Sequence, residues 1–210
     1  ELNAAYGGGS LEANATYSVE EKVLTADVTA KNVTHVTPGR PKDDVHINAK
    51  LAVLAKVLKD RVQVHAAADT MALEWRGLKI DRASLDGAFN SKGLEIDHFS
   101  SFSGPKGILL ATGSVSREGQ LQIKGKMTDF PIHPVLAAAG KDGNGLCSTG
   151  FAVGGQLTAP AFAGIIQLSE AEFMAQKIKE AHGFVSLKDN FLTIKNFRAN
   201  MEQGYHIISG

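Results

Sequence analysis

The sequence lacks disulfide-forming cysteine pairs, a net charge and long apolar runs. Its single cysteine, Cys147, cannot form an internal disulfide, so the fold must rest on packing and backbone pairing. The 22 basic side chains balance 22 acidic ones, which leaves no net field to attract nucleic acid or an anionic membrane surface. The sequence has no run of about 18 apolar residues, which a membrane-spanning helix would need. Its first residues do not resemble a signal peptide. We therefore expect a fragment of a longer protein, with any membrane anchor or targeting signal outside it.

Catalytic motifs are also missing. The seven histidines are scattered, without HExxH or Cys/His ligand spacing, so we expect no metal site and no cofactor. Ser114 in "TGSVS" lacks the second glycine of a hydrolase nucleophile elbow, and "YGGGS" (6–10) lacks the helix that must follow a phosphate-binding loop. Clustered carboxylates of the kind that a polysaccharide-active β-helix enzyme needs are absent too. The sequence predicts that the chain is not an enzyme.

What the sequence does contain is period-2 alternation of apolar and polar residues. The stretch "GILLATGSVSREGQLQIKGKMTDF" (107–130) alternates, turns at 117–120 and alternates again, which predicts a β-hairpin. The same alternation predicts further strands at 11–19, 22–33, 45–57, 61–75, 93–99 and 190–201. Turn-forming residues punctuate the chain at Gly7-Gly8-Gly9, Pro38-Gly39, Asp86-Gly87, Lys92-Gly93, Glu118-Gly119 and Asp189-Asn190. This order predicts a meander of consecutive antiparallel strands.

Two segments fit the alternation poorly. Residues 134–145 begin with proline and continue with alanines, which favours a short helical turn followed by a loop. In residues 169–183, Ser169 and Glu172 have capping-box spacing, so helix propensity competes with strand there. We favour strand for 169–183 on the family resemblance described below.

The chain also repeats itself with a period near 98 residues. Leu192 follows Leu94, and Ile194 follows Ile96, by 98 positions. Residues 8–36 align in the same way with residues 106–135, with a slip of one residue at the turn. This period predicts tandem β units, and we expect 1–210 to be one continuous repeat segment. Since no second layer is encoded, the apolar face of such a sheet must curl on itself or be covered by something else.

Residues 154–168 resemble a repeated stretch of a known protein family. "GGQLTAPAFAGIIQL" (154–168) is similar to a stretch that recurs in the TamB and AsmA-like proteins of double-membraned bacteria. The residues in the expected places are Gly155, Leu157, Pro160, Gly164, Ile166 and Leu168. The resemblance implies an all-β fold: an elongated, curved, mainly antiparallel sheet folded into an open trough, the β-taco, with an apolar interior. It also implies a periplasmic body anchored to the inner membrane by a segment outside this chain, which carries phospholipid toward the outer membrane or assists outer-membrane β-barrel assembly.

Alternation and the resemblance together predict which side chains line the trough. In the hairpin, one face of each strand is apolar, while Thr112, Ser114, Gln122 and Lys124 lie on the other. The abundance of alanine and glycine at inward positions suggests room for an acyl chain. A closed sandwich core built from the same residues is the alternative. The predicted lipid-groove residues are Val45, Ile47, Leu51, Val62, Val64, Leu94, Ile96, Leu109, Ala111, Val115, Leu121, Ile123, Met127, Leu157, Ile166, Leu168, Leu192 and Ile194.

Two functions follow from these two interpretations. The first is a periplasmic, non-enzymatic segment whose groove carries phospholipid acyl chains between the membranes, with outer-membrane assembly proteins as further partners. The second is a structural or adhesive β-solenoid with a packed core that binds protein partners on its outer face.

Overall fold

The computed structural model describes residues 2–35, 45–75, 78–133, 136, 142–173, 176–189, 191–201 and 204–208. The chain divides into two compact units, Glu1–Pro105 (unit 1) and Lys106–Gly210 (unit 2). Each unit is described by itself below.

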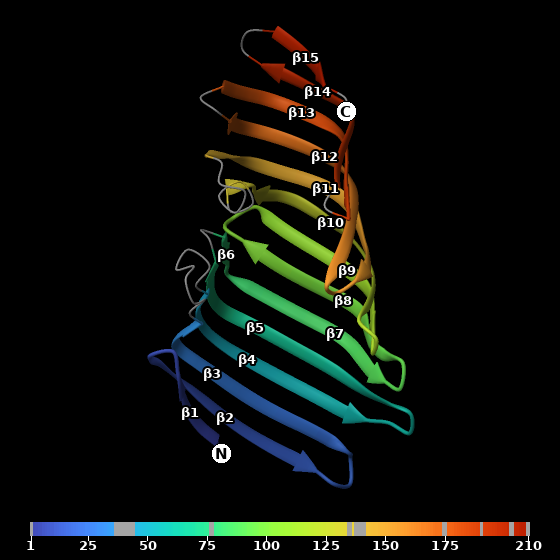
Figure 1. Cartoon of the computed structure of the whole chain (residues 1–210). Coiled ribbons are helices and arrows are strands. Elements are labelled where there is room, and N and C mark those ends of the chain that lie inside the picture. Colours follow the sequence, from blue (N-terminus) through green and yellow to red (C-terminus); the bar gives the residue numbers. More distant parts are fainter. Residues whose placement is uncertain are drawn as a thin grey trace. The chain divides into compact units, whose positions relative to one another are not determined.

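Unit 1 is an antiparallel sheet in which hydrogen-bonded neighbours follow chain order (Figure 1). Strand β6 stands outside this order and pairs with β5 alone. The strands are β1 (Leu2–Tyr6), β2 (Gly9–Ser18), β3 (Val23–His35), β4 (Val45–Val57), β5 (Arg61–Trp75), β6 (Leu78–Ile80), β7 (Arg82–Asn90) and β8 (Gly93–Ser103).

Unit 2 is a second antiparallel meander, in which each strand pairs with the next along the chain. Its strands are β9 (Gly107–Ser116), β10 (Gln120–Pro131), β11 (Gly143–Gln156), β12 (Ala159–Phe173), β13 (Gln176–Lys188), β14 (Phe191–Met201) and β15 (Gly204–Ile208). Among the described residues, the first and last strands of a unit do not pair with each other, so neither sheet closes on itself. The predicted all-β, antiparallel and open fold class is confirmed.

Strand boundaries recur along the chain. Strands β2 and β9 begin 98 positions apart, at Gly9 and Gly107, and also end 98 positions apart. The same displacement relates both ends of β5 to those of β12, and both ends of β8 to those of β14. The period that is seen in single apolar residues is therefore also a period of whole strands.

A β-bulge recurs with nearly the same spacing. Asn32 in β3 and Asp129 in β10 have positive φ (52° and 48°), and each lies where the register with the next strand shifts. The Asn32 N–H donates a hydrogen bond to Asn48 Oδ1 at 2.7 Å, and the Asp129 N–H donates one to Ser148 Oγ at 3.0 Å. Since a bulge leaves a backbone N–H outside the ladder, these side chains from the adjacent strand supply the acceptor.

One predicted turn is wrong. Asp86-Gly87 lies inside β7, at a register shift with β8, rather than at a chain reversal. A glycine that serves a turn also serves a bulge, because a Cβ on Gly87 would come within 2.3 Å of the Glu95 carbonyl oxygen.

The two ambiguous segments have different outcomes. In 169–183 the described residues are strand, since β12 runs to Phe173 and β13 begins at Gln176, so the preference for strand is confirmed there. Most of 134–145 lies outside the described residues, as do Pro38-Gly39 and Asn190. The Leu136 N–H donates to the Ile132 carbonyl at 3.1 Å, which is a single helical bond.

Candidate functional site

The opening hairpin of unit 2 has one apolar face. Residues directly opposite each other in an antiparallel pair point to the same side of the sheet. Leu121 is opposite Val115, and Met127 is opposite Leu109. The predicted sharing of one face by the two strands is therefore borne out by the register.

This face continues across unit 2, where we call it the apolar face of that unit. Ile123 is opposite Val153 in β11, and Val153 is opposite Phe162 in β12. Its members on the remaining strands, which are linked by the same opposite pairs, include Ile166, Leu168, Ile178, Ala181, Val185, Leu187, Leu192, Ile194 and Ala199.

Unit 1 has an apolar face of its own. The row Leu24, Ala55, Val64, Gly87 and Ile96 crosses five strands, each residue opposite the next. Its predicted groove residues are all on this face: Val45, Ile47, Leu51, Val62, Val64, Leu94 and Ile96.

The apolar faces are incompletely covered. Along β4, half-buried side chains alternate with exposed ones from Val45 to Lys56. In unit 2, Leu109, Ile123 and Met127 are likewise half-buried. The described residues are helical only at His133 and Leu136, so in that part of the chain no helical layer lies on either face. Most of the predicted groove residues thus belong to a sheet face without a helical cover.

Leu157 is the exception among the predicted groove residues. It lies in the turn between β11 and β12 and is 64% exposed, so it is not part of a strand wall. The motif-like stretch that includes it spans a chain reversal, which the resemblance did not reveal.

The expected space above the small residues of unit 2 is filled. A Cβ on Gly125 would lie 2.7 Å from Phe151 Cζ, and a Cβ on Gly183 would lie 2.8 Å from Phe197 Cδ2. The Phe151 ring also stacks on Phe162, with centroids 6.2 Å apart. The interpretation of glycine as room for an acyl chain is therefore wrong at these positions, because aromatic rings from neighbouring strands occupy the space.

Burial differs between the two ends of the strands. Farther from the β4–β5, β7–β8 and β13–β14 turns the apolar faces are closed, with Ala68 at 2% exposure in unit 1 and Ala181 at 0% in unit 2. Near the tight β7–β8 and β13–β14 turns the apolar faces are open, with Phe89 at 51% and Leu192 at 61%, whereas Leu121 beside the β9–β10 turn is buried at 7%. Small side chains at the closed ends are consistent with close packing there.

Two rows of apolar side chains lie at the open ends. Rim row 1 crosses β4, β5, β7 and β8 in unit 1, and rim row 2 crosses β11, β12, β13 and β14 in unit 2. In each row, every residue is directly opposite the next. Rim row 1 is Val57, Val62, Phe89 and Leu94; rim row 2 is Val153, Phe162, Leu187 and Leu192.

Sequence reasoning found only part of these rows. It selected Val62, Leu94 and Leu192 but missed the other five members, among them the exposed Phe89 and Leu187, which are 98 positions apart. Alternation along Leu85, Gly87 and Phe89 would have found Phe89, and the 98-residue period would then have given Leu187.

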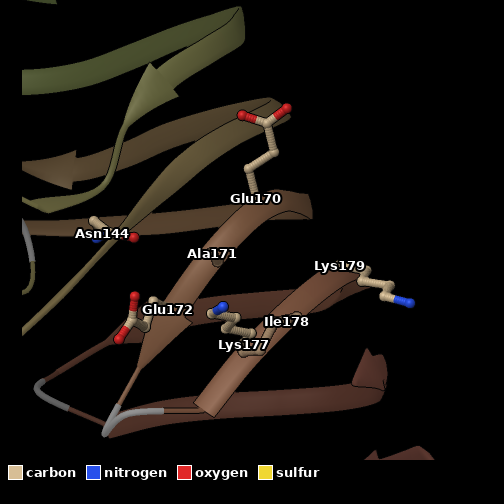
Figure 2. Close-up of a pocket in the computed structure, with 7 residues that line it drawn as sticks. All are labelled: Asn144, Glu170, Ala171, Glu172, Lys177, Ile178 and Lys179. Atoms are coloured by element: carbon tan, nitrogen blue, oxygen red, sulfur yellow. The ribbon is translucent and has the colours of Figure 1, made fainter. Parts of the chain in front are cut away.

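A pocket of about 390 Å³ lies elsewhere in unit 2 (Figure 2). It is lined by Asn144, Glu170, Ala171, Glu172, Lys177, Ile178 and Lys179, none of which was a predicted groove residue. Figure 2 shows Glu172 and Lys177 close together, with Lys179 extending away from them. Its two acidic and two basic side chains balance, so it has no charge preference.

Other reactive groups are few in the described part of the chain. His65 Nδ1 lies 2.5 Å from Asp86 Oδ1 on the exposed polar face, and the described residues hold no cluster of three or more metal-ligating side chains. Burial raises the pKa of the Cys147 thiol to about 11, so it is protonated at neutral pH and a poor nucleophile. No helix among the described residues has the length and apolarity that a membrane span requires.

Comparisons with protein families, with curated proteins and with solved structures find no match to this chain.

Proposed function

We propose that this chain is a lipid-handling segment of a TamB-like envelope protein, whose apolar sheet faces carry phospholipid acyl chains across the periplasm of a double-membraned bacterium. The observation that carries the proposal is the half-exposed apolar face of each unit, continuous from strand to strand and without a helical layer in the described residues. A face of this kind is unfavourable in water unless a ligand covers it.

The energetics favour acyl chains as the ligand. Each methylene that leaves water gains about 0.8 kcal/mol, so moving a chain of about sixteen carbons through open water costs on the order of 12 kcal/mol. An apolar face removes most of this barrier. Because the bilayer interior is similarly apolar, the chain gains little on binding and is released again at the far end.

Repetition supports the proposal. Strands and a bulge that recur at about 98 positions give each unit a similar apolar face, as expected for a segment of a repeating carrier. In this proposal the segment is periplasmic and non-enzymatic, and the inner-membrane anchor lies outside it. A role in outer-membrane protein assembly stays a prediction.

A structural, protein-binding β-solenoid is the second candidate. The aromatic rings that fill the space above Gly125 and Gly183 favour it, because they make that part of unit 2 a packed core. The two functions differ in whether lipid copurifies: native mass spectrometry of protein extracted from membranes should detect bound lipid if the first is right, and none if the second is right.

Paired substitutions test the lipid-carrying function. Ile47→Asp places a charge on the apolar face of unit 1, and Asn48→Asp places the same charge on the polar face one position later. We expect Ile47→Asp to reduce crosslinking to a phospholipid with a photoreactive acyl chain at least fivefold, with Asn48→Asp unchanged. Ile123→Asp and Gln122→Asp form the matched pair in unit 2. Circular dichroism checks that each variant is folded, and equal crosslinking by both members of the folded pairs would overturn the proposal.

A further inference from the structure

The two rim rows have equivalent apolar residues but different charges around them. Phe89 and Leu187 correspond by the 98-residue period, as do Leu94 and Leu192. In both rows the third side chain is exposed, Phe89 at 51% and Leu187 at 40%. The apolar part of each row therefore offers an acyl chain a similar surface.

The charges at two of the tight turns beside rim row 1, β4–β5 and β7–β8, are predominantly basic. Residues 56–63 and 88–95 contain four basic side chains and two acidic ones, Asp60 and Glu95. The basic side chains Lys59, Arg61 and Lys92 belong to residues that are exposed at the two tight turns beside the row. The corresponding residues of unit 2, 154–161 and 186–193, contain only Lys188 and Asp189 as charged residues. The β2–β3 turn also borders this row, since the Val57 N–H donates a hydrogen bond to the Lys22 carbonyl, and it adds Glu20, Glu21 and Lys22. Rim row 1 thus has a local excess of one positive charge, centred on the β4–β5 and β7–β8 turns, and rim row 2 has none.

We propose that rim row 1 is a binding site for an anionic amphiphile, with its acyl chain on Val57, Val62, Phe89 and Leu94 and its carboxylate or phosphate headgroup at the basic tight turns. This inference rests on the proposed lipid-carrying function and assigns to one end of the apolar face a headgroup preference. Charge complementarity selects the occupant, since a purely apolar ligand gains nothing from the basic turns.

Geometry fits this occupant. Strands lie about 4.8 Å apart, so four side chains in a row across four strands span roughly 15 Å. The flexible stems of Lys59 and Lys92 let their ammonium groups reach a headgroup at the sheet edge while the acyl chain stays on the row. The opposite end of the same face is closed at Ala68, which keeps the headgroup at the tight-turn end.

A titration followed by native mass spectrometry tests the site. Dodecanoate and dilauroyl phosphatidylglycerol supply the two anionic headgroups, and dilauroyl phosphatidylcholine is the zwitterionic comparison. Because each basic residue near an anionic headgroup contributes about 1 kcal/mol, the double variant Lys59→Gln/Lys92→Gln should weaken binding of the anionic amphiphiles roughly tenfold or more. Binding of the zwitterionic lipid should change less than twofold.

Two controls separate the site from general effects. Lys124→Gln/Lys126→Gln removes the same charge from the polar face and should leave the anionic affinity unchanged. Phe89→Glu should remove one bound amphiphile, whereas Phe191→Glu, on the polar face beside rim row 2, should remove none. Preference for only one of the two anionic headgroups supports the site and identifies the headgroup.

The failures are distinguishable. Equal wild-type affinity for anionic and zwitterionic lipids, or equal effects of the two lysine double variants, overturns this inference and leaves the proposed function intact if Ile47 and Ile123 still control crosslinking. A wild-type chain that binds no lipid overturns both.

Discussion

Ser101 is a polar side chain on the apolar face of unit 1, opposite Ala83, and it is 0% exposed. Its Oγ has no hydrogen-bond partner among the described residues. The adjacent Ser100 points to the other face, where its Oγ lies 2.7 Å from Ser84 Oγ. Two consecutive serines are therefore both buried, one without a hydrogen-bond partner and one with a partner.

This difference predicts opposite effects of removing the hydroxyl. Ser101→Ala removes an unsatisfied polar atom, so the free energy of unfolding should stay unchanged or rise by up to about 2 kcal/mol. Ser100→Ala leaves Ser84 Oγ without its hydrogen-bond partner and should lower the free energy of unfolding by about 1 kcal/mol. Urea denaturation measures both. A loss in Ser101→Ala as large as that in Ser100→Ala would contradict this account.

The sequence could not place Ser101. Strict alternation from Leu94 and Ile96 assigns His98 and Ser100 to the apolar face. The register shift opposite Asp86-Gly87 adds one residue to β8, which moves Phe99 and Ser101 onto that face instead. A single inserted residue reverses every later assignment on the strand, and no composition signal marks where it occurs.

At the scale of elements, most strands were predictable because period-2 alternation is strong. Strands β4 and β5 have the bounds expected from it, 45–57 and 61–75. The turn between β11 and β12 was not predicted, because Leu157-Thr158 contains none of the residues that usually mark turns. The signals lie on either side of the turn: Gly155, whose φ of 84° favours glycine, two residues before it, and Pro160 two residues after it.

Glycines within strands serve two different purposes, and this gives a second stability prediction. Gly125 lies where a Cβ would come within 2.3 Å of the Leu110 carbonyl oxygen and 2.7 Å of Phe151 Cζ, whereas a Cβ on Gly150 would contact nothing within 4 Å. Gly125→Ala should lower the free energy of unfolding by about 1–3 kcal/mol, because backbone and ring must both shift.

Gly150→Ala is the matched control. Because the added Cβ meets no neighbour, Gly150→Ala should leave the free energy of unfolding unchanged or raise it by about 0.5 kcal/mol, since the unfolded chain has lower entropy. Thermal and urea unfolding of the two variants give the comparison. Similar destabilisation by both would show that the ring above Gly125 does not constrain the sheet.

At the scale of the whole chain, the recurrence of strands and of a bulge near 98 positions links two units whose apolar faces were inferred separately. The apolar period was visible in the sequence, since residues such as Leu94 and Leu192 repeat it. The sequence did not show which ends of those faces are closed and which are open, because burial depends on which strand ends lie next to one another. The candidate site is therefore narrower than the predicted groove and includes the exposed rim rows.

A crosslinking scan along the strands shows directly whether the apolar faces carry lipid. A photoreactive phenylalanine analogue is placed in turn at Val62, Gln63 and Val64 in unit 1, and at Gln122, Ile123 and Lys124 in unit 2, and lipid adducts are counted after irradiation in bacterial membranes. Because successive side chains point to opposite faces, we expect adducts at Val62, Val64 and Ile123 and few at Gln63, Gln122 and Lys124. Adducts at all six positions, or at none, would contradict the claim that the apolar faces carry lipid.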